Sequence, residues 1–239
     1  GWEGRGELDT GGRLEAWCTA LMVWACYLRT MPRTITGGDS GEVMAAACSW
    51  SPAHPPGYPL FVALAQAAMF ALQGIGDNKA FRVNLMCTVL TAVGVYHLHR
   101  AVRLVTGSGP AALAAAGMYG LSPLIWNNAM QAEVFSLNNM MACLLTHVLC
   151  RFLARERRDD ASLAYLGALL AGLGLANQHT LVFYLAVIVP TVLWSAARTL
   201  LRPLPILGLS LLFLAGLSPY CHMWLIQGCP LPWAADPPS

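Results

Sequence analysis

Long apolar runs, broken by short polar segments, alternate along almost the whole chain. Between Arg103 and Arg151 lie about 47 residues, of which only Glu133 is charged. As one helix this interval would be roughly 70 Å long, against a membrane hydrocarbon core of ~30 Å. The interval must therefore fold back once, and its polar break, from Trp126 to Glu133, is the predicted turn.

A second interval, from Asp160 to Arg198, contains about 37 residues and no charged residue. A single helix of ~55 Å would again be too long for one crossing, so we predict a break at 177–180. Together with the plainer apolar runs, these intervals predict seven membrane-spanning helices, at about 16–31, 83–99, 110–126, 135–153, 162–176, 180–197 and 204–222.

The apolar run at 57–74 is a doubtful eighth span. It has Pro59 near its start, Gln66 in its middle and Gln73 at its end, together with many alanines. Such a segment makes a weak span, so we expect it to lie along the membrane interface or to dip into it.

The composition supports a membrane protein and excludes several soluble classes. The 239 residues are 56% hydrophobic and 11% charged, whereas globular chains carry about a quarter of charged residues. Intrinsic disorder, collagen, coiled coil and a basic nucleic-acid-binding protein are excluded by the same numbers. We therefore predict an all-α polytopic membrane protein that binds no nucleic acid.

The arginines fix the expected orientation of the spans. All but one of the 14 basic residues are arginines, and many lie in three clusters. These are Arg100 and Arg103; Arg151, Arg155, Arg157 and Arg158; and Arg198 and Arg202. Two spans separate each cluster from the next, so the positive-inside rule places all three on the cytoplasmic side. Glu133 and the break at 177–180 then face the opposite side, which is the lumen in a eukaryotic secretory membrane.

This orientation divides the chain into two parts. We expect residues 1–15 to form an N-terminal cytoplasmic segment and residues 16–239 to form the transmembrane domain. Its first lumenal loop would run from about 33 to 82, provided that 57–74 does not cross the membrane, and would then carry Asp39.

The first two polar patches lie in that loop. Asp39 and Glu42, in the run Thr36-Gly37-Gly38-Asp39-Ser40-Gly41-Glu42, have the spacing of a helix capping box. Two carboxylates at a membrane surface also suit a general base, because partial desolvation raises a carboxyl pKa. His54 follows, in the turn Ala53-His54-Pro55-Pro56-Gly57-Tyr58-Pro59, whose prolines alone could explain a rigid turn.

The other two patches interrupt the later spans. Glu133 is an acid at a membrane boundary, where a functional role is the first hypothesis and a helix N-terminal carboxylate is the alternative. The run Asn177-Gln178-His179-Thr180 joins two short helices, where a simple turn would favour Gly, Pro or charge. Its composition indicates a polar-lined cavity.

These motifs, taken together and in this order, resemble the transmembrane protein 260 family of endoplasmic-reticulum protein O-mannosyltransferases, which have the GT-C fold. The resemblance rests on the two loop patches and on four later stretches, Phe81-Arg82-Val83-Asn84-Leu85, Ala132-Glu133-Val134-Phe135-Ser136-Leu137-Asn138-Asn139, Asn177-Gln178-His179-Thr180 and Gly216-Leu217-Ser218-Pro219-Tyr220. It covers the chain from about residue 16 onwards. Members of the family are longer, so the chain is expected to be part of such a protein.

The resemblance implies an inverting transferase in the endoplasmic-reticulum membrane with a lumenal active face. It implies transfer of mannose from dolichyl-phosphate-mannose, within the lipid membrane, to Ser or Thr of secretory-pathway proteins. Asp39 would be the base, with Glu42 and Glu133 as further catalytic candidates. The substrate-binding candidates are His54, Tyr58, Arg82, Asn177, Gln178 and His179. The lipid-linked sugar is a substrate, so no cofactor is expected.

Three alternatives stay open at this point. The chain could be a GT-C enzyme with another lipid-linked sugar or acceptor, a membrane transporter whose polar breaks line a path, or an inactive scaffold. Transporters tend to have internal repeats and charges in mid-span, which this sequence does not show. No metal site is predicted, because hard cations want more oxygen ligands than the visible acids supply.

Overall fold

The regular elements of the computed structural model, which describes residues 10–76, 78–155 and 160–225, are all helical. The helices are α1 (Thr10–Thr30), α2 (Ser40–Ser49), α3 (Pro59–Ala71), α4 (Lys79–Thr106), α5 (Gly109–Gly120), α6 (Pro123–Ala129), α7 (Phe135–Ala154), α8 (Ser162–Leu175), η1 (His179–Leu181), α9 (Val182–Ser195), α10 (Ala197–Leu200), α11 (Pro203–Gly216) and α12 (Pro219–Leu225). Residues 1–9 of the predicted N-terminal segment, and Arg157 and Arg158, lie outside the described residues.

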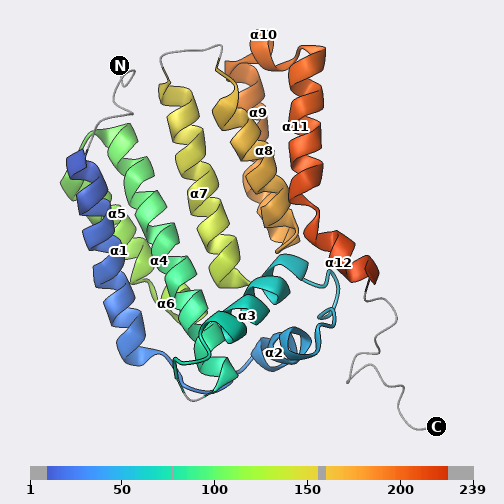
Figure 1. Ribbon diagram of the computed structural model, residues 1–239. Helices are drawn as coiled ribbons and strands as arrows, with labels where there is room; N and C mark the ends of the chain where they lie inside the picture. Colours follow the sequence, from blue (N-terminus) through green and yellow to red (C-terminus); the bar gives the residue numbers. More distant parts are fainter. Residues whose placement is uncertain (1–9, 77, 156–159, 226–239) are drawn as a thin grey trace.

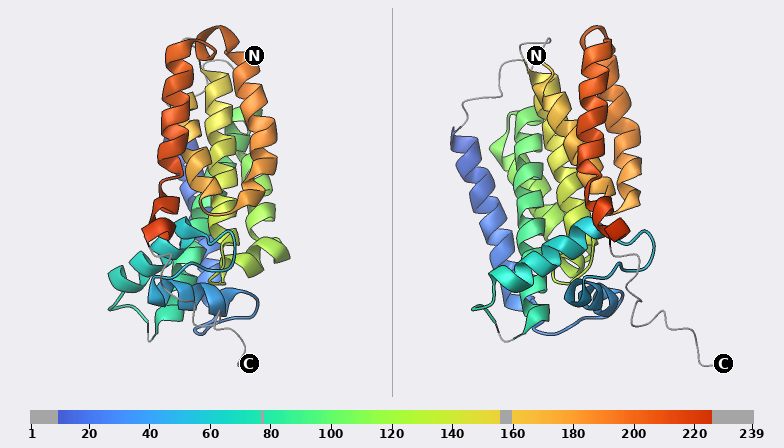
Figure 2. Two further views of the ribbon diagram at one scale, coloured as in Figure 1. Left: turned by 90° about the vertical axis from the view of Figure 1, so that its right-hand side faces the viewer. Right: turned by 45° about the vertical axis from the view of Figure 1, so that its right-hand side comes forward.

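Seven helices, α1, α4, α5, α7, α8, α9 and α11, run side by side as a bundle (Figure 1). They correspond in order to the seven helices that the apolar runs predict. Helices α2, α3 and α12 gather at one end of the bundle, and α10 lies at the other (Figures 1 and 2). Helix α3, the doubtful eighth span, crosses that end obliquely instead of running along the bundle.

Two of the predicted spans, 110–126 and 204–222, were too long. Helix α5 ends at Gly120 and α11 ends at Gly216, and each is followed by Leu-Ser-Pro and a short separate helix. The residue before a proline is pushed out of the helical region, and Ser122 accordingly has ψ 141°. The proline then begins the next helix, where its missing N–H costs nothing.

Two helices of the described chain, α4 and α7, are long and apolar enough to cross a membrane by length and composition. Helix α4 has 28 residues and α7 has 20, whereas α8, α9 and α11 have 14 each. At 1.5 Å per residue, 14 residues make about 21 Å, short of a ~30 Å hydrocarbon core. Seven complete spans are therefore not evident from helix length alone.

The largest apolar core lies at the end of the bundle that α2 and α3 cover. Phe61 of α3, Val43 of α2, Val83 of α4 and Leu137 of α7 are almost fully buried in it. Helix α2 packs on α3, and α3 packs on α4, so the loop that carries Asp39 is held against this end. The last turns of α4 and α7, which hold the arginines, lie at the opposite end (Figure 1).

Candidate functional site

Helix α2 begins just after Asp39, but the predicted capping box does not form. The backbone N–H of Val43 donates to the Asp39 carbonyl, whereas the Asp39 side chain makes no capping hydrogen bond. The prediction that Glu42 completes the box was also wrong, because its carboxylate turns away towards the Pro-rich loop. Both acids of the first patch are thus available for other contacts.

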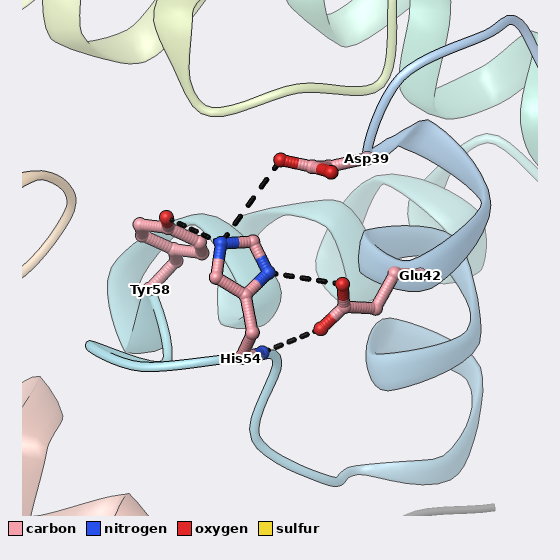
Figure 3. A network of polar contacts seen from close by, with 4 residues as sticks. All are labelled: Asp39, Glu42, His54 and Tyr58. Atoms are coloured by element: carbon pink, nitrogen blue, oxygen red, sulfur yellow. Dashed lines mark hydrogen bonds and ion pairs between the residues drawn. The ribbon is translucent and has the colours of Figure 1, made fainter. Parts of the chain in front are cut away.

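Glu42 holds His54 by two hydrogen bonds (Figure 3). One Glu42 oxygen accepts from the backbone N–H of His54, and the other lies 2.9 Å from the ring Nδ1. Two prolines and a glycine follow His54, so the loop has few conformations available and returns the chain directly to α3. The sequence reasoning named both residues but did not predict their contact.

The other ring nitrogen of His54 faces two further groups. The Tyr58 hydroxyl is 2.9 Å from Nε2, and Asp39 Oδ2 is 4.0 Å from the same atom (Figure 3). The Asp39 side chain is 65% exposed, whereas that of Glu42 is 24% exposed. Partial burial raises the pKa of Tyr58, and the charges of Asp39 and Glu42 raise it further. The hydroxyl of Tyr58 therefore stays protonated at neutral pH.

The backbone of Tyr58 has φ 48° and ψ 48°, in the left-handed region. This conformation costs a non-glycine residue roughly 1–2 kcal/mol, so the surrounding contacts must hold it. It places the tyrosine at the N-cap of α3 with its ring against His54, 5.1 Å between centroids. Strained residues of this kind gather at functional sites.

Glu133 reaches the same cluster from the loop between α6 and α7. Its carboxylate lies against Gly38 and accepts a hydrogen bond from the backbone N–H of Asp39. The residue is only 8% exposed. Burial raises the pKa of the Glu133 carboxyl, the charge of Asp39 raises it further, and the Asp39 N–H bond opposes both. The two acidic loops of the sequence prediction thus meet.

Asn177 and Gln178 lie behind Glu133, at the end of α8. Asn177 is fully buried and its amide donates to the carbonyl of Val134, which fixes the start of α7 against α8. The side-chain oxygens of Asn177 and Gln178 are buried without a hydrogen-bond partner among the described residues. Both are therefore unpartnered acceptors inside the protein, which suits an ordered water.

His179 is exposed, and its Nε2 lies 2.8 Å from the hydroxyl of Tyr220 in α12. The Tyr220 hydroxyl is also 3.3 Å from the carbonyl of Leu175. Sequence reasoning did not place Tyr220 in the site, although the polar break before it, Leu217-Ser218-Pro219, followed an apolar run and was part of the motif noted above. That break turns α12 towards His179.

The start of α3 connects the two His–Tyr pairs. The backbone N–H of Leu60 donates to the carbonyl of Ala176, and Gly57 packs against Met223 of α12. Burial raises the pKa of Tyr220, and Tyr58 is near enough to raise it further. The pair His54–Tyr58 and the pair His179–Tyr220 therefore border one polar region.

Arg82 is the one predicted site residue that the structure places elsewhere. Its guanidinium donates to the backbone carbonyls of Met69, Gln73 and Ile75, at the end of α3 and in the loop after it. These carbonyls lack helical partners, so Arg82 satisfies them and holds the loop. These contacts give Arg82 a structural role at the C-terminal end of α3, away from the cluster around His54.

The cluster contains carboxylates in two different environments and two histidine rings that each contact a tyrosine hydroxyl. Asp39 is exposed to solvent, Glu133 is shielded, and His54 links Asp39 to Glu42. Such a set can take a proton from a hydroxyl and can donate hydrogen bonds to an anion. Within the described residues, no three His, Cys, Asp or Glu side chains are grouped so as to hold a metal ion.

The chain is similar to known proteins. The family model described as Protein O-mannosyl-transferase TMEM260 N-terminal domain matches residues 39–201. The chain is 38% identical to Protein O-mannosyl-transferase TMEM260 of Mus musculus, over 92% of this chain and 31% of the mouse protein. It is 32% identical to Protein O-mannosyl-transferase tmem260 of Dictyostelium discoideum, over 87% of this chain and 27% of that protein. The chain thus spans less than a third of either relative. No solved structure matches it.

Proposed function

The chain belongs to the protein O-mannosyl-transferase TMEM260 family, and from this premise we propose that it is the catalytic part of such a transferase. The reaction moves mannose from dolichyl-phosphate-mannose to a Ser or Thr hydroxyl of a secretory-pathway protein. It takes place at the lumenal face of the endoplasmic-reticulum membrane. The relatives' names support the transfer of mannose to proteins, and the donor and the membrane are assigned from the resemblance of the motifs to this family.

The single observation that carries the proposal is the position of Asp39. Its carboxylate is exposed, makes no helix-capping bond, and lies between the His54 loop and Glu133. A transferred sugar requires a base that takes the acceptor hydroxyl proton as the oxygen attacks the sugar carbon. A single displacement of this kind inverts the configuration at that carbon, and we assign Asp39 as the base.

Glu133 orients Asp39 in this account. Its shielded carboxylate accepts the Asp39 backbone N–H and so fixes the residue from behind. The amide oxygens of Asn177 and Gln178 are buried without a partner and suit a water that bridges the protein and the sugar.

The leaving phosphate is assigned to the pair His179 and Tyr220. An imidazole and a phenol held together at 2.8 Å supply donors for the charge that develops on the phosphate oxygen. Arg82 is not used, because backbone carbonyls occupy its guanidinium.

An apolar groove supports a lipid-linked donor. It has a volume of about 470 Å³ and lies between α7, α8, α9 and α11, with Val148, Ala171, Ile188 and Phe213 in its lining. Ala171 is one helical turn from Leu175, whose carbonyl contacts Tyr220. A polyprenyl chain in this groove would bring its phosphate to the His179 pair. The short spans α8, α9 and α11 border the groove, which fits a GT-C-like bundle in the membrane.

The orientation of the bundle follows from its two ends. The arginines of α4 and α7 lie at the end opposite Asp39, which the positive-inside rule makes cytoplasmic. Helix α3, which crosses the other end, then lies at the lumenal interface (Figure 2).

A transfer assay tests the proposal. The whole protein, in membranes, is supplied with a Ser/Thr peptide and with labelled dolichyl-phosphate-mannose, dolichyl-phosphate-glucose or a nucleotide-linked mannose. We expect label on the peptide from dolichyl-phosphate-mannose alone, linked with inverted configuration. Label from another donor would contradict the assigned substrate, and retained configuration would contradict the single displacement.

A further inference from the structure

We propose that His54 receives the proton that Asp39 takes from the acceptor, and that Glu42 is the positioning residue that fixes the ring of His54 for this purpose. The inference rests on the proposed function, which supplies the hydroxyl proton. It assigns catalytic work to the Pro-rich loop, which would otherwise only lead into α3.

The contacts of Glu42 determine which nitrogen of His54 carries hydrogen. An ionised carboxylate can only accept, so the contact of 2.9 Å from Glu42 requires a proton on Nδ1. In the neutral ring Nε2 is then an acceptor, and the Tyr58 hydroxyl donates to it. A carboxylate that fixes one nitrogen of an imidazole, so that the other can take a proton, is the arrangement of a catalytic triad.

Nε2 of His54, which accepts from the Tyr58 hydroxyl, also faces the base. Asp39 Oδ2 lies 4.0 Å from Nε2, and the His54 side chain is 37% exposed. This separation is longer than a hydrogen bond, and catalytic contacts in an empty site commonly shorten when the substrate is bound. Two charged groups face the ring of His54, Glu42 in α2 and Asp39 just before that helix. The third polar neighbour is the neutral hydroxyl of Tyr58, at the start of α3.

Bond making, bond breaking and proton transfer are linked in one step. The acceptor oxygen forms a bond to the sugar carbon as the bond from that carbon to the phosphate oxygen breaks, and the electron pair leaves with the phosphate. The hydroxyl proton passes to the Asp39 carboxylate and then to Nε2 of His54. The Tyr58 hydroxyl, which donated to Nε2, turns and accepts from it. Glu42 stabilises the imidazolium, and the ring later releases the proton to water, so that Asp39 is ionised for the next turnover.

A purely structural role for Glu42 is the competing explanation, because its carboxylate also accepts the backbone N–H of His54. The substitution Glu42→Gln separates the two roles. The amide oxygen can still accept the backbone N–H, but the amide nitrogen must donate to Nδ1 and so forces the proton onto Nε2. The loop is kept while the proton acceptor is lost.

The experiment measures kcat and KM of mannose transfer by the whole protein in detergent or membranes. We expect Glu42→Gln to lower kcat by about 10²-fold with KM for the donor within about twofold. Glu15→Gln is the matched control, since Glu15 pairs with Arg103 at the opposite end of the bundle, and it should keep wild-type kcat. For His54→Ala, free imidazole should restore part of the lost kcat, and it should leave the kcat of Glu15→Gln unchanged.

Three results would overturn the inference. They are a wild-type kcat in Glu42→Gln, a loss confined to KM or to the amount of folded protein, and a His54→Ala variant that imidazole does not rescue. Asp39→Asn in the same assay separates this inference from the proposed function. If Asp39→Asn is active, the assignment of the base fails; if it is inactive while Glu42→Gln has wild-type kcat, the relay to His54 alone fails.

Discussion

Glu133 accepts a hydrogen bond from the backbone N–H of Asp39, although the two residues belong to different loops of the chain. The carboxylate of Glu133 is buried, whereas the carboxylate of Asp39 is exposed to solvent. Two acids of the same region therefore have different environments, which is how proteins give carboxyl groups different tasks. In this account Glu133 positions and Asp39 reacts.

The raised pKa of Glu133 predicts a pH-dependent stability. A carboxyl whose pKa is higher in the folded state than in the unfolded state lowers the stability of the fold at any pH where both states have lost the proton. Stability relative to a neutral residue is therefore lost as the pH rises from about 4.5 through the folded pKa, and is level above it. Glu133→Gln should match the wild type at low pH and have the higher melting temperature at neutral pH.

This prediction is measured as the difference in thermal unfolding midpoint in detergent between pH 4 and pH 8. A difference that does not change with pH would contradict the raised pKa. Because Asp39 contributes to the shift, the same difference measured in an Asp39→Asn background should be smaller.

Two neighbouring glycines test how closely Glu133 packs. A Cβ at Gly38 would lie 2.3 Å from Glu133 Oε1, and its φ of +68° disfavours any side chain, whereas a Cβ at Gly37 would have no atom within 4 Å. We expect Gly38→Ala to cost about 1–2 kcal/mol of stability and most of the transfer activity. Gly37→Ala, the control, should be close to wild type in both assays, and equal losses would contradict the contact.

The crossing of α8 and α11 sets the position of the His179–Tyr220 pair. A Cβ at Gly172 would lie 2.2 Å from the Phe213 carbonyl oxygen and 2.9 Å from Gly216 Cα, which are backbone atoms that cannot turn aside. Gly172→Ala should destabilise the protein by about 1–3 kcal/mol, measured by thermal unfolding. At Gly167, on the same helix, the nearest atom would be 4.0 Å away, so Gly167→Ala should be neutral or slightly stabilising.

The hydroxyl of Tyr220 should matter more for the donor than for the fold. Tyr220→Phe removes the contact with His179 Nε2 and keeps the ring. We expect KM for the donor to rise about fivefold, the equivalent of roughly 1 kcal/mol, from kinetics with varied dolichyl-phosphate-mannose. Tyr165→Phe, in the first turn of α8 away from the site, serves as the control. An unchanged KM in Tyr220→Phe would remove this tyrosine from the phosphate site.

The helices were largely predictable because scarce charges and long apolar runs mark them clearly. The ends of α5 and α11 were not predicted because the sequence stays largely apolar past the Ser-Pro steps at Ser122 and Ser218, where the backbone must leave the helix. Helix α4 is longer than its apolar run, 83–99, because Asn78 caps its start and Gly107 ends it beyond the first arginines.

The composition of the site was predictable, but its contacts were not. Asp39, Glu42 and His54 stand out locally because polar residues are rare in this chain. That Glu42 turns to His54 instead of capping α2 depends on where the Pro-rich loop returns, which spacing alone does not give. Arg82 was expected to bind substrate from the resemblance alone, and only the fold shows that backbone carbonyls at the end of α3 bind its guanidinium.

The most direct measurement is the kcat of mannose transfer by Asp39→Asn beside Asp160→Asn in the whole protein. Asp160 accepts the backbone N–H of Ser162 before α8, a bond that asparagine can also make, so its variant should keep wild-type activity. We expect Asp39→Asn to fold, to bind dolichyl-phosphate-mannose and to lose at least about 10²-fold in kcat. Transfer by Asp39→Asn at the rate of Asp160→Asn would contradict Asp39 as the base.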